Sequence, residues 1–302
     1  MNGTTPSPTA ASEPDTASPT EKLLKLPIIE RYTSHYARYN GSIGRKGENQ
    51  TTHTAEIRFP GHTQLAVVKA FPLKNKGWVN EALAWTLGME LDIGVPPAAI
   101  LLAASPSDLA NATEPELVFA RNQWGADGPI VFWCASRLDL KPPNQVWRIN
   151  WEHAVTSKPA GQRLAAFDAW MGNCDRISDN APYWSARGRI AAIDHEKLAF
   201  NQDWVHSAPA HLDRSGFIAT HLTQKIREAI SKKKMRVAEA KVLIAALAKI
   251  SAEHSAALAA VRGSSEELVS KNFGTPAANN LHTFLFERAS QEFIDERLEQ
   301  LR

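Results

Sequence analysis

The first half of the chain alternates short apolar runs with polar turns, a pattern typical of β-strands. These runs are rich in β-branched and aromatic residues, and clusters of glycine, proline and asparagine separate them. We predict six strands, at residues 28–39, 51–59, 64–71, 98–103, 116–121 and 129–137. After the third strand the apolar period changes to that of a helix, through Val79, Leu83 and Leu87, with Asn80 or an earlier residue near its cap. The Gly-Val-Pro-Pro run at residues 94–97 ends this helix. The order predicts an antiparallel sheet with one inserted helix.

The second half has helical periodicity almost throughout. Segments 147–155 and 162–172 are amphipathic, and a longer pattern follows over residues 221–261 with one expected break. Ser264 with the glutamates after it suggests a new helix start, and residues 280–301 form the last predicted helix. The chain is therefore expected to be α+β and two-lobed. The predicted organisation is a disordered Ser/Thr/Pro/Ala tail at 1–22, a β-rich N-lobe at 23–140 and a helical C-lobe at 141–302.

Composition excludes several classes of function. The chain has 302 residues, of which 43% are hydrophobic, so it can bury a sizeable core. A formal net charge of +2 gives no general case for binding nucleic acid or a membrane surface. Its two cysteines, Cys134 and Cys174, are too few for a disulfide scaffold and fit a reducing compartment. We see no apolar segment of membrane-spanning length and no signal peptide, so we expect a cytoplasmic protein.

Three oxygen-bearing side chains are the strongest chemical candidates. Asp175 and Asn180 lie in a polar segment after an apolar helix, and Asp194 ends a predicted short buried strand at residues 189–193. Transfer of a phosphoryl group to a hydroxyl needs a carboxylate that accepts or orients the hydroxyl proton. It also needs oxygen ligands for Mg²⁺ on the nucleotide. These three residues would supply both.

The N-terminal half offers partners for nucleotide phosphates. Gly41, Ser42 and Gly44 belong to a glycine-rich loop whose backbone N–H groups can approach phosphates closely, although an ordinary hairpin loop has the same composition. Lys69 interrupts an apolar strand, which is costly unless an anion lies beside it. Glu81 in the following helix can be that anion. The alternative places Lys69 on the solvent face of an edge strand and leaves Glu81 to favour the helix dipole.

The order of these elements follows the protein-kinase scheme: glycine loop, strand lysine, helix glutamate, Asp-x4-Asn, short strand, aspartate. The phrases WMGNCDRISDN at 170–180 and IAAIDHEKLAF at 190–200 resemble the catalytic segment of HipA-like kinases, especially the short stand-alone members. VNEALAWTLGMELDIGVPPA at 79–98 resembles their helix that ends in Gly-Val-Pro. The similarity covers roughly residues 60–205, and Ile177 stands where the family has a loop histidine.

This resemblance implies a protein-kinase-like fold and an ATP- and Mg²⁺-dependent kinase with a serine/threonine-type acceptor. It makes Asp175 the catalytic base and Lys69 the phosphate-binding cation, with Asn180 and Asp194 as Mg²⁺ ligands. Adenine would contact the backbone of residues 133–138, a range that begins at Trp133 and includes Ser136. An antitoxin-like protein is the partner that HipA proteins usually have.

Two alternatives stay open. Aminoglycoside and choline phosphotransferases share the Asp-x4-Asn and Ile-Asp layout, so the acceptor can instead be a small-molecule hydroxyl. A kinase-fold binding module without catalysis is the third hypothesis, favoured by Ile177 and the unspecific glycine loop. The sequence leaves the acceptor, the partner proteins and the oligomeric state undefined.

Overall fold

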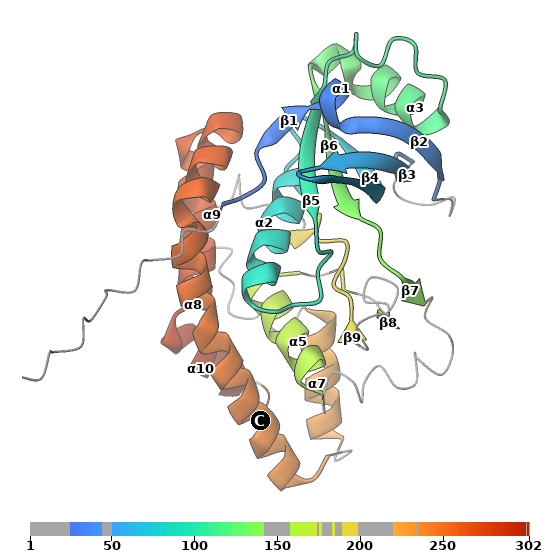
Figure 1. Cartoon of the computed structure of the whole chain (residues 1–302). Helices are drawn as coiled ribbons and strands as arrows, with labels where there is room; N and C mark the ends of the chain where they lie inside the picture. Colours follow the sequence, from blue (N-terminus) through green and yellow to red (C-terminus); the bar gives the residue numbers. More distant parts are fainter. Residues whose placement is uncertain are drawn as a thin grey trace, which may run out of the picture.

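The computed structural model describes residues 25–43, 50–141, 158–173, 175–176, 183–184, 189–198, 220–232, 235–299 and 301. The predictions for the tail at 1–22, the helix at 147–155, Gly44, Ile177 and Asn180 lie outside these residues. Within them, the predicted α+β class is confirmed, with a six-stranded sheet in the first part and helices in the second (Figure 1).

The sheet has the spatial order β1-β5-β6-β4-β3-β2. Its strands are β1 (Ile29–Arg31), β2 (Tyr36–Ser42), β3 (His53–Phe59), β4 (His62–Pro72), β5 (Ala99–Ala104) and β6 (Ile130–Ser136). All neighbours are antiparallel except β1 and β5, which run parallel, so the prediction of a purely antiparallel sheet is wrong at one edge. Strand β4 lies between β6 and β3, which also removes the alternative of Lys69 on an edge strand.

Two predicted strands differ from the structure. The run at 28–39 is divided into β1, the short helix α1 (Tyr32–His35) and β2. The run at 116–121 is not a strand but belongs to helix α3 (Pro115–Trp124), which the short η1 (Gly125–Asp127) follows. Proline at the first helical position favours a helix, and the residues that α3 buries are Glu116, Leu117 and Ala120, one helical face.

Apolar clusters cover both faces of the sheet. One cluster lies on the face that carries α3 and includes Phe132 and Cys134 of β6. The other includes Val131 and Trp133 of the same strand and continues into helix α2 (Gly77–Glu90) and the helical region. Figure 1 shows α2 between the sheet and the long helix α8. The core of the sheet is thereby joined to that of the helices.

The helical region contains α5 (Pro159–Met171), α7 (His221–Ser231), α8 (Val237–Phe273), α9 (Thr275–Arg288) and α10 (Gln291–Glu299). A second, small sheet has the order β7-β8-β9, formed by Leu140–Lys141, Tyr183–Trp184 and Arg189–Ile190. The predicted single break within residues 221–261 is confirmed, because α7 ends at Ser231 and α8 begins at Val237, but no helix begins at Ser264. There α8 continues because Val261, Ser265 and Val269 stay buried at helical spacing, and the Ser264 hydroxyl bonds back to the carbonyl of Val261. The predicted last helix is two helices, α9 and α10.

Helix α8 also bears on the prediction about membranes. By length and composition it is apolar enough to cross one, with a mean hydropathy of 1.4 over its most apolar window, of which 33% is buried inside the structure. The prediction that the chain has no apolar segment of membrane-spanning length is therefore wrong for this helix. The feature is weak evidence of a membrane span, because core helices pass the same test, and α8 packs along α5 and α9.

A buried arginine joins α9 to the end of α5. Arg288 is fully buried, and its guanidinium donates to the carbonyls of Ala169 and Trp170 in the last turn of α5. In return the indole N–H of Trp170 donates to the carbonyl of Leu285 at 2.9 Å. Burial lowers the pKa of Arg288 to about 9. Cations at a helix C-terminus stabilise the unpaired carbonyls, so α9 fixes the point where the chain leaves α5.

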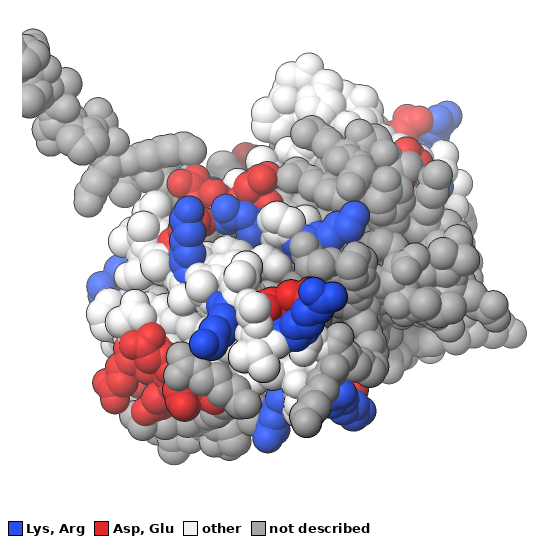
Figure 2. Space-filling view, turned by 90° about the horizontal axis from the view of Figure 1, so that it is seen from below, with Lys and Arg blue, Asp and Glu red and all other residues white. Residues whose placement is uncertain are grey.

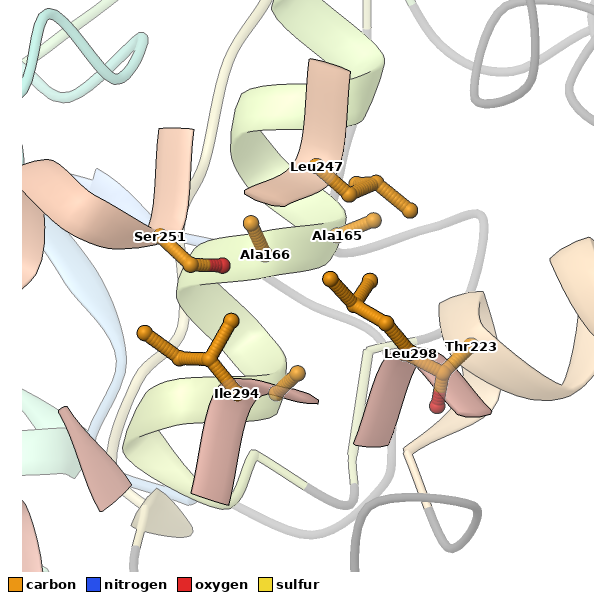
Figure 3. Close-up of a pocket in the computed structure, with 8 residues that line it drawn as sticks. Ala165, Ala166, Thr223, Leu247, Ser251, Ile294 and Leu298 are labelled. Carbon is orange, nitrogen blue, oxygen red and sulfur yellow. The ribbon is translucent and has the colours of Figure 1, made fainter. Parts of the chain in front are cut away.

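A small apolar void remains between the helices (Figure 3). It is lined by Ala165, Ala166, Ala169, Thr223, Leu247, Ser251, Ile294 and Leu298. Its only polar groups are the hydroxyls of Thr223 and Ser251, so the void has no charge to offer a phosphorylated ligand. The candidate chemistry lies elsewhere.

Candidate active site

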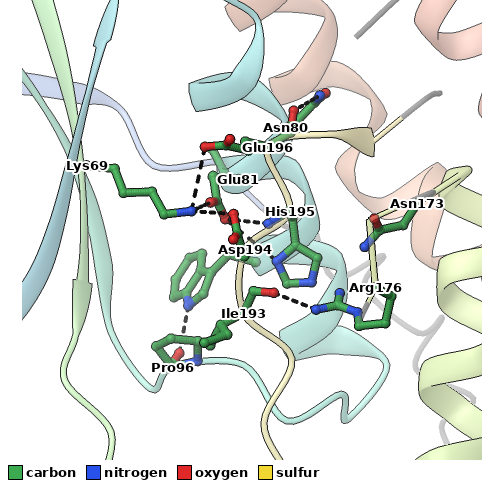
Figure 4. A network of polar contacts seen from close by, with 12 residues as sticks. Lys69, Asn80, Glu81, Pro96, Asn173, Arg176, Ile193, Asp194, His195 and Glu196 are labelled. Atoms are coloured by element: carbon green, nitrogen blue, oxygen red, sulfur yellow. Dashed lines mark hydrogen bonds and ion pairs between the residues drawn. The ribbon is translucent and has the colours of Figure 1, made fainter. Parts of the chain in front are cut away.

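Lys69 lies at the centre of a cluster of carboxylates, as Figure 4 shows. Its ammonium is 2.7 Å from Oε1 of Glu81 and 2.6 Å from Oδ1 of Asp194, and 3.7 Å from Oε2 of Glu196. Strand β4 supplies the lysine, helix α2 supplies Glu81, and the segment after β9 supplies the other two. We call these four residues the Lys69 centre. The anionic partner that the sequence requires for Lys69 is therefore present.

Charge in this centre is unbalanced. Burial alone would lower the pKa of Lys69, but the three carboxylates outweigh burial and raise that pKa. Burial would raise the pKa of Glu81, but Lys69 and His195 lower it to about 2. The pKa of Glu196 is raised by burial and by the carboxylates of Asp194 and Glu81. One fixed ammonium thus faces three carboxylates, and Oε2 of Glu196 lacks a hydrogen-bond partner among the described residues.

This donor set suits a hard divalent cation. Ligand oxygens of Glu81, Asp194 and Glu196 all lie within 4.8 Å of one another. Mg²⁺ prefers carboxylate oxygens and keeps several waters, and the side chains of Asp194 and Glu196 are partly open to solvent, at 31% and 22%. Glu81 is already engaged by Lys69 and by the backbone N–H of His195. Asp194 is therefore the best placed of the three to reach a nucleotide-bound cation.

The position of Asp194 depends on an unusual local backbone conformation. Its φ of 63° is in the left-handed region, which a non-glycine residue adopts at a cost and where aspartate is tolerated best. Just before it, the N–H of Ala192 donates to the carbonyl of Gly94 at 2.8 Å. A Cβ on Gly94 would lie 2.0 Å from the carbonyl oxygen of Ile190. Gly94, which was predicted to end a helix, therefore also allows the segment that leads to Asp194 to approach its backbone closely.

A second charged group holds the segment that carries Asp175. Arg176 and Asp168 of α5 are both fully buried, and Nε of the arginine is 3.0 Å from Oδ2 of the aspartate. Asn173 donates to the other oxygen of Asp168, and its own side-chain oxygen accepts from the N–H of Asp175. Arg176 also donates to the carbonyl of Ile193, the residue before Asp194. We call Asp168, Asn173, Arg176 and this carbonyl the Arg176 centre.

His195 lies between the two centres. Its backbone N–H donates to Glu81 at 3.1 Å, while its ring packs edge-on against Phe167 of α5. Burial lowers the pKa of this histidine, and the nearby Arg176 cation lowers it further against the opposing effect of Glu81. The ring of His195 lies between Glu81, whose Oε2 is 3.6 Å from Nδ1 of the histidine, and the Arg176 centre (Figure 4).

Asp175 itself faces a lysine that the sequence analysis did not identify. Nζ of Lys197 is 3.0 Å from Oδ2 of Asp175, and both side chains are partly exposed. Arg176 lies in the phrase WMGNCDRISDN and Lys197 in the phrase IAAIDHEKLAF, whereas Asp168 lies outside both. Neither phrase assigned a role to these residues, so only the contacts in the structure identify them.

Two of the predicted glycine-loop residues, Gly41 and Ser42, are described by the structure, and they lie apart from Lys69. Gly41 and Ser42 belong to β2, where Ser42 lies opposite His53, which in turn lies opposite Val68. Tyr39 ties this end of β2 to α3, because its hydroxyl donates to Glu116 and contacts the hydroxyl of Ser42. Gly41 and Ser42 therefore lie on β2, two strands away from Lys69 on β4, just before residues 44–49, which the structure does not describe.

The predicted adenine contacts lie on β6. Trp133 is the register partner of Lys69, and its buried ring contacts Trp85 edge-on. The backbone N–H of Ser136 donates to Ala98, and that of Arg137 donates to Leu65. Because these two N–H groups are already used inside the sheet, a base that needs a backbone donor must find it beyond Arg137.

Comparisons with known proteins add one structural likeness. The sequence matches no protein-family model and no curated protein. Among solved structures, the chain is similar to a Helicobacter pylori proinflammatory kinase, CtkA, at 14% sequence identity with a TM-score of 0.48. The similarity covers 91% of this chain and 98% of that one. The likeness concerns the course of the chain.

Proposed function

We propose that the protein is an ATP- and Mg²⁺-dependent phosphotransferase that moves the γ-phosphate of ATP to a hydroxyl. One observation carries the proposal: a buried lysine of the sheet contacts both a glutamate of α2 and the aspartate that follows a short strand. These are the parts that kinases use to hold nucleotide phosphates and their metal. The resemblance of residues 170–180 and 190–200 to HipA-like kinases supports a serine/threonine-type acceptor.

Each part has a defined task in this proposal. Glu81 fixes the Lys69 ammonium, which contacts the phosphates of the nucleotide. Asp194, with Asn180, would hold Mg²⁺, which when bound would neutralise charge on the phosphates. Asp175 accepts the proton of the attacking hydroxyl. The backbone after Arg137 would supply the contacts for adenine, because the N–H groups of Ser136 and Arg137 are engaged.

The test is calorimetric titration of the full chain with Mg·ATP, beside an Asp194→Asn variant. We expect wild-type binding, and a loss of about tenfold or more in affinity when the carboxylate is removed. Asp92→Asn is the matched control, because Asp92 also has a left-handed backbone, with a φ of 50°, and lies outside the site. Absence of Mg·ATP binding by the wild type would reject the proposal.

The acceptor is settled by a separate screen with γ-labelled ATP. A labelled protein band indicates a protein kinase, and a labelled small molecule indicates an aminoglycoside- or choline-type phosphotransferase. Binding without any transfer, together with a cellular phenotype that survives Asp175→Ala, identifies a kinase-fold binding module.

A further inference from the structure

Lys197 is the described cation in contact with the proposed base. Its ammonium is 3.0 Å from Oδ2 of Asp175, and its side chain is 28% exposed, so it is partly open to solvent and is not buried in the core. A lysine on a surface usually points into water, and an exposed pair contributes little to stability. A contact with the one carboxylate that must meet the acceptor therefore calls for a functional explanation.

The backbone around Lys197 is held from helix α2. The side-chain amide of Asn80, itself buried, donates to the carbonyl of Glu196 at 2.9 Å and to that of Leu198 at 3.4 Å. These two carbonyls flank Lys197 on either side. Asn80 is next in sequence to Glu81, so the same turn of α2 fixes both Lys69 and the segment that carries Lys197. Of the predicted cap positions, Asn80 or an earlier residue, the structure has the earlier one, because α2 begins at Gly77 with Lys76 as its N-cap.

The other cations near the site are already engaged. Lys69 contacts Glu81 and Asp194 on the nucleotide side. Arg176 directly follows Asp175, but its guanidinium is fully buried against Asp168 and the carbonyl of Ile193. Within the described part of the site, this leaves Lys197 as the cation able to reach a group that approaches Asp175.

We propose that Lys197 is a further catalytic residue, which binds the transferred γ-phosphoryl group next to Asp175. The inference rests on the proposed function. In the transfer, the acceptor oxygen bonds to the γ-phosphorus while the bond from that phosphorus to the β–γ bridging oxygen breaks, and its electron pair leaves with ADP. The hydroxyl proton moves to Asp175. Lys197 forms and breaks no covalent bond; its ammonium stabilises the charge on the γ-phosphoryl oxygens as they pass the base.

Comparison of ATP with ADP tests this role, because only ATP carries the γ-phosphoryl group. The experiment measures the affinity of the full chain for Mg·ATP and Mg·ADP by calorimetry, and the release of γ-labelled phosphate to water. For Lys197→Met we expect Mg·ATP binding to weaken about tenfold or more, Mg·ADP binding to change less than about twofold, and phosphate release to fall about 10²-fold. Lys197→Arg keeps the charge and is expected to recover part of the loss.

Lys225→Met is the matched control. Lys225 is 27% exposed and lies 3.8 Å from Glu228 in α7, so it has nearly the same exposure and a longer ion pair outside the site. Equal weakening of ATP and ADP binding in Lys197→Met would show a structural role and overturn the inference. So would behaviour identical to that of Lys225→Met. If the wild type itself binds no Mg·ATP, the proposed function fails first, and this result is distinct from the other two.

Discussion

The two charged centres differ in how completely the protein satisfies them. In the Arg176 centre, one guanidinium faces one carboxylate, both are fully buried, and an asparagine and a carbonyl take up the remaining bonds. In the Lys69 centre, one ammonium faces three carboxylates, and two of these are partly open to solvent. The first centre is balanced and closed, whereas the second has excess negative charge and is open.

We interpret the Arg176 centre as a scaffold and the Lys69 centre as the candidate binding site. A closed, balanced pair gains nothing from a ligand and fixes the elements that meet at it, here α5, Asp175 and the carbonyl before Asp194. An open cluster with surplus carboxylates is more costly until a cation arrives. We therefore expect substitutions in the Arg176 centre to change stability first, and substitutions in the Lys69 centre to change ligand response first.

The largest expected effect is that of Asp168→Asn. This change leaves Arg176 buried without its charge partner, which costs about 3–5 kcal/mol of unfolding free energy. Urea unfolding measures the loss. The exposed pair Arg163–Glu253 provides the control, since Arg163→Gln should cost about 1 kcal/mol or less. A second change, Arg176→Met in the Asp168→Asn background, should recover part of the stability because it removes the unpaired charge. Similar losses for Asp168→Asn and Arg163→Gln would contradict the scaffold role.

Gly94→Ala is expected to have an intermediate effect on both centres. The new Cβ would lie 2.0 Å from the carbonyl oxygen of Ile190, so the segment that leads to Asp194 must shift. We expect a loss of about 1–3 kcal/mol in unfolding free energy, with weaker Mg·ATP binding. Gly263→Ala in α8 meets no atom within 4 Å and should stabilise the helix by about 0.5–1 kcal/mol. Equal unfolding free energies for the two variants would show that the close approach at Gly94 does not affect stability.

The smallest expected effect is a gain. Glu196→Gln removes one surplus negative charge beside Asp194 and should raise the unfolding free energy of the ligand-free protein by up to about 1 kcal/mol. Because the surplus charge is what attracts the ion, the same variant should gain less in melting temperature from Mg²⁺ than the wild type gains. Thermal unfolding with and without Mg²⁺ measures both. A variant less stable than the wild type without ions would show that Glu196 serves Lys69 as a stabilising partner.

Sequence patterns predicted the parts of the fold that depend on local periodicity. Strands β3, β4 and β6 and helix α2 agree closely with their apolar runs, and the burial cost of Lys69 correctly indicated an anionic partner. The helix α3 was missed because its apolar run suits either structure, and contact with the sheet decides between them. The continuous α8 was missed because local capping signals at Ser264 are weaker than the buried stripe that crosses them.

Part of the candidate site was predicted from the spacing of a motif, and the pairing of Lys69 with an anion from its burial cost. Asp175, Asn180 and Asp194 follow such a motif, whereas Lys197, Asn80 and Asp168 act through contacts across the fold. The hydrogen bond from Asn80 to Glu196, for example, joins residues 116 positions apart. No local pattern encodes a contact between residues so far apart in the sequence, because it depends on how α2 packs beside the segment that carries Asp194 and Glu196.

The contacts of Arg288 determine how far the chain can be shortened from its C-terminus. The helix that leads into Asp175 ends on carbonyls that are capped from 118 residues further along the chain. A fragment that stops after α8 would keep every residue of the Lys69 centre, yet it would leave the end of α5 uncapped and the indole of Trp170 without its acceptor. The smallest unit that keeps the end of α5 capped therefore extends through α9, and α9 belongs to the framework that holds the segment of Asp175.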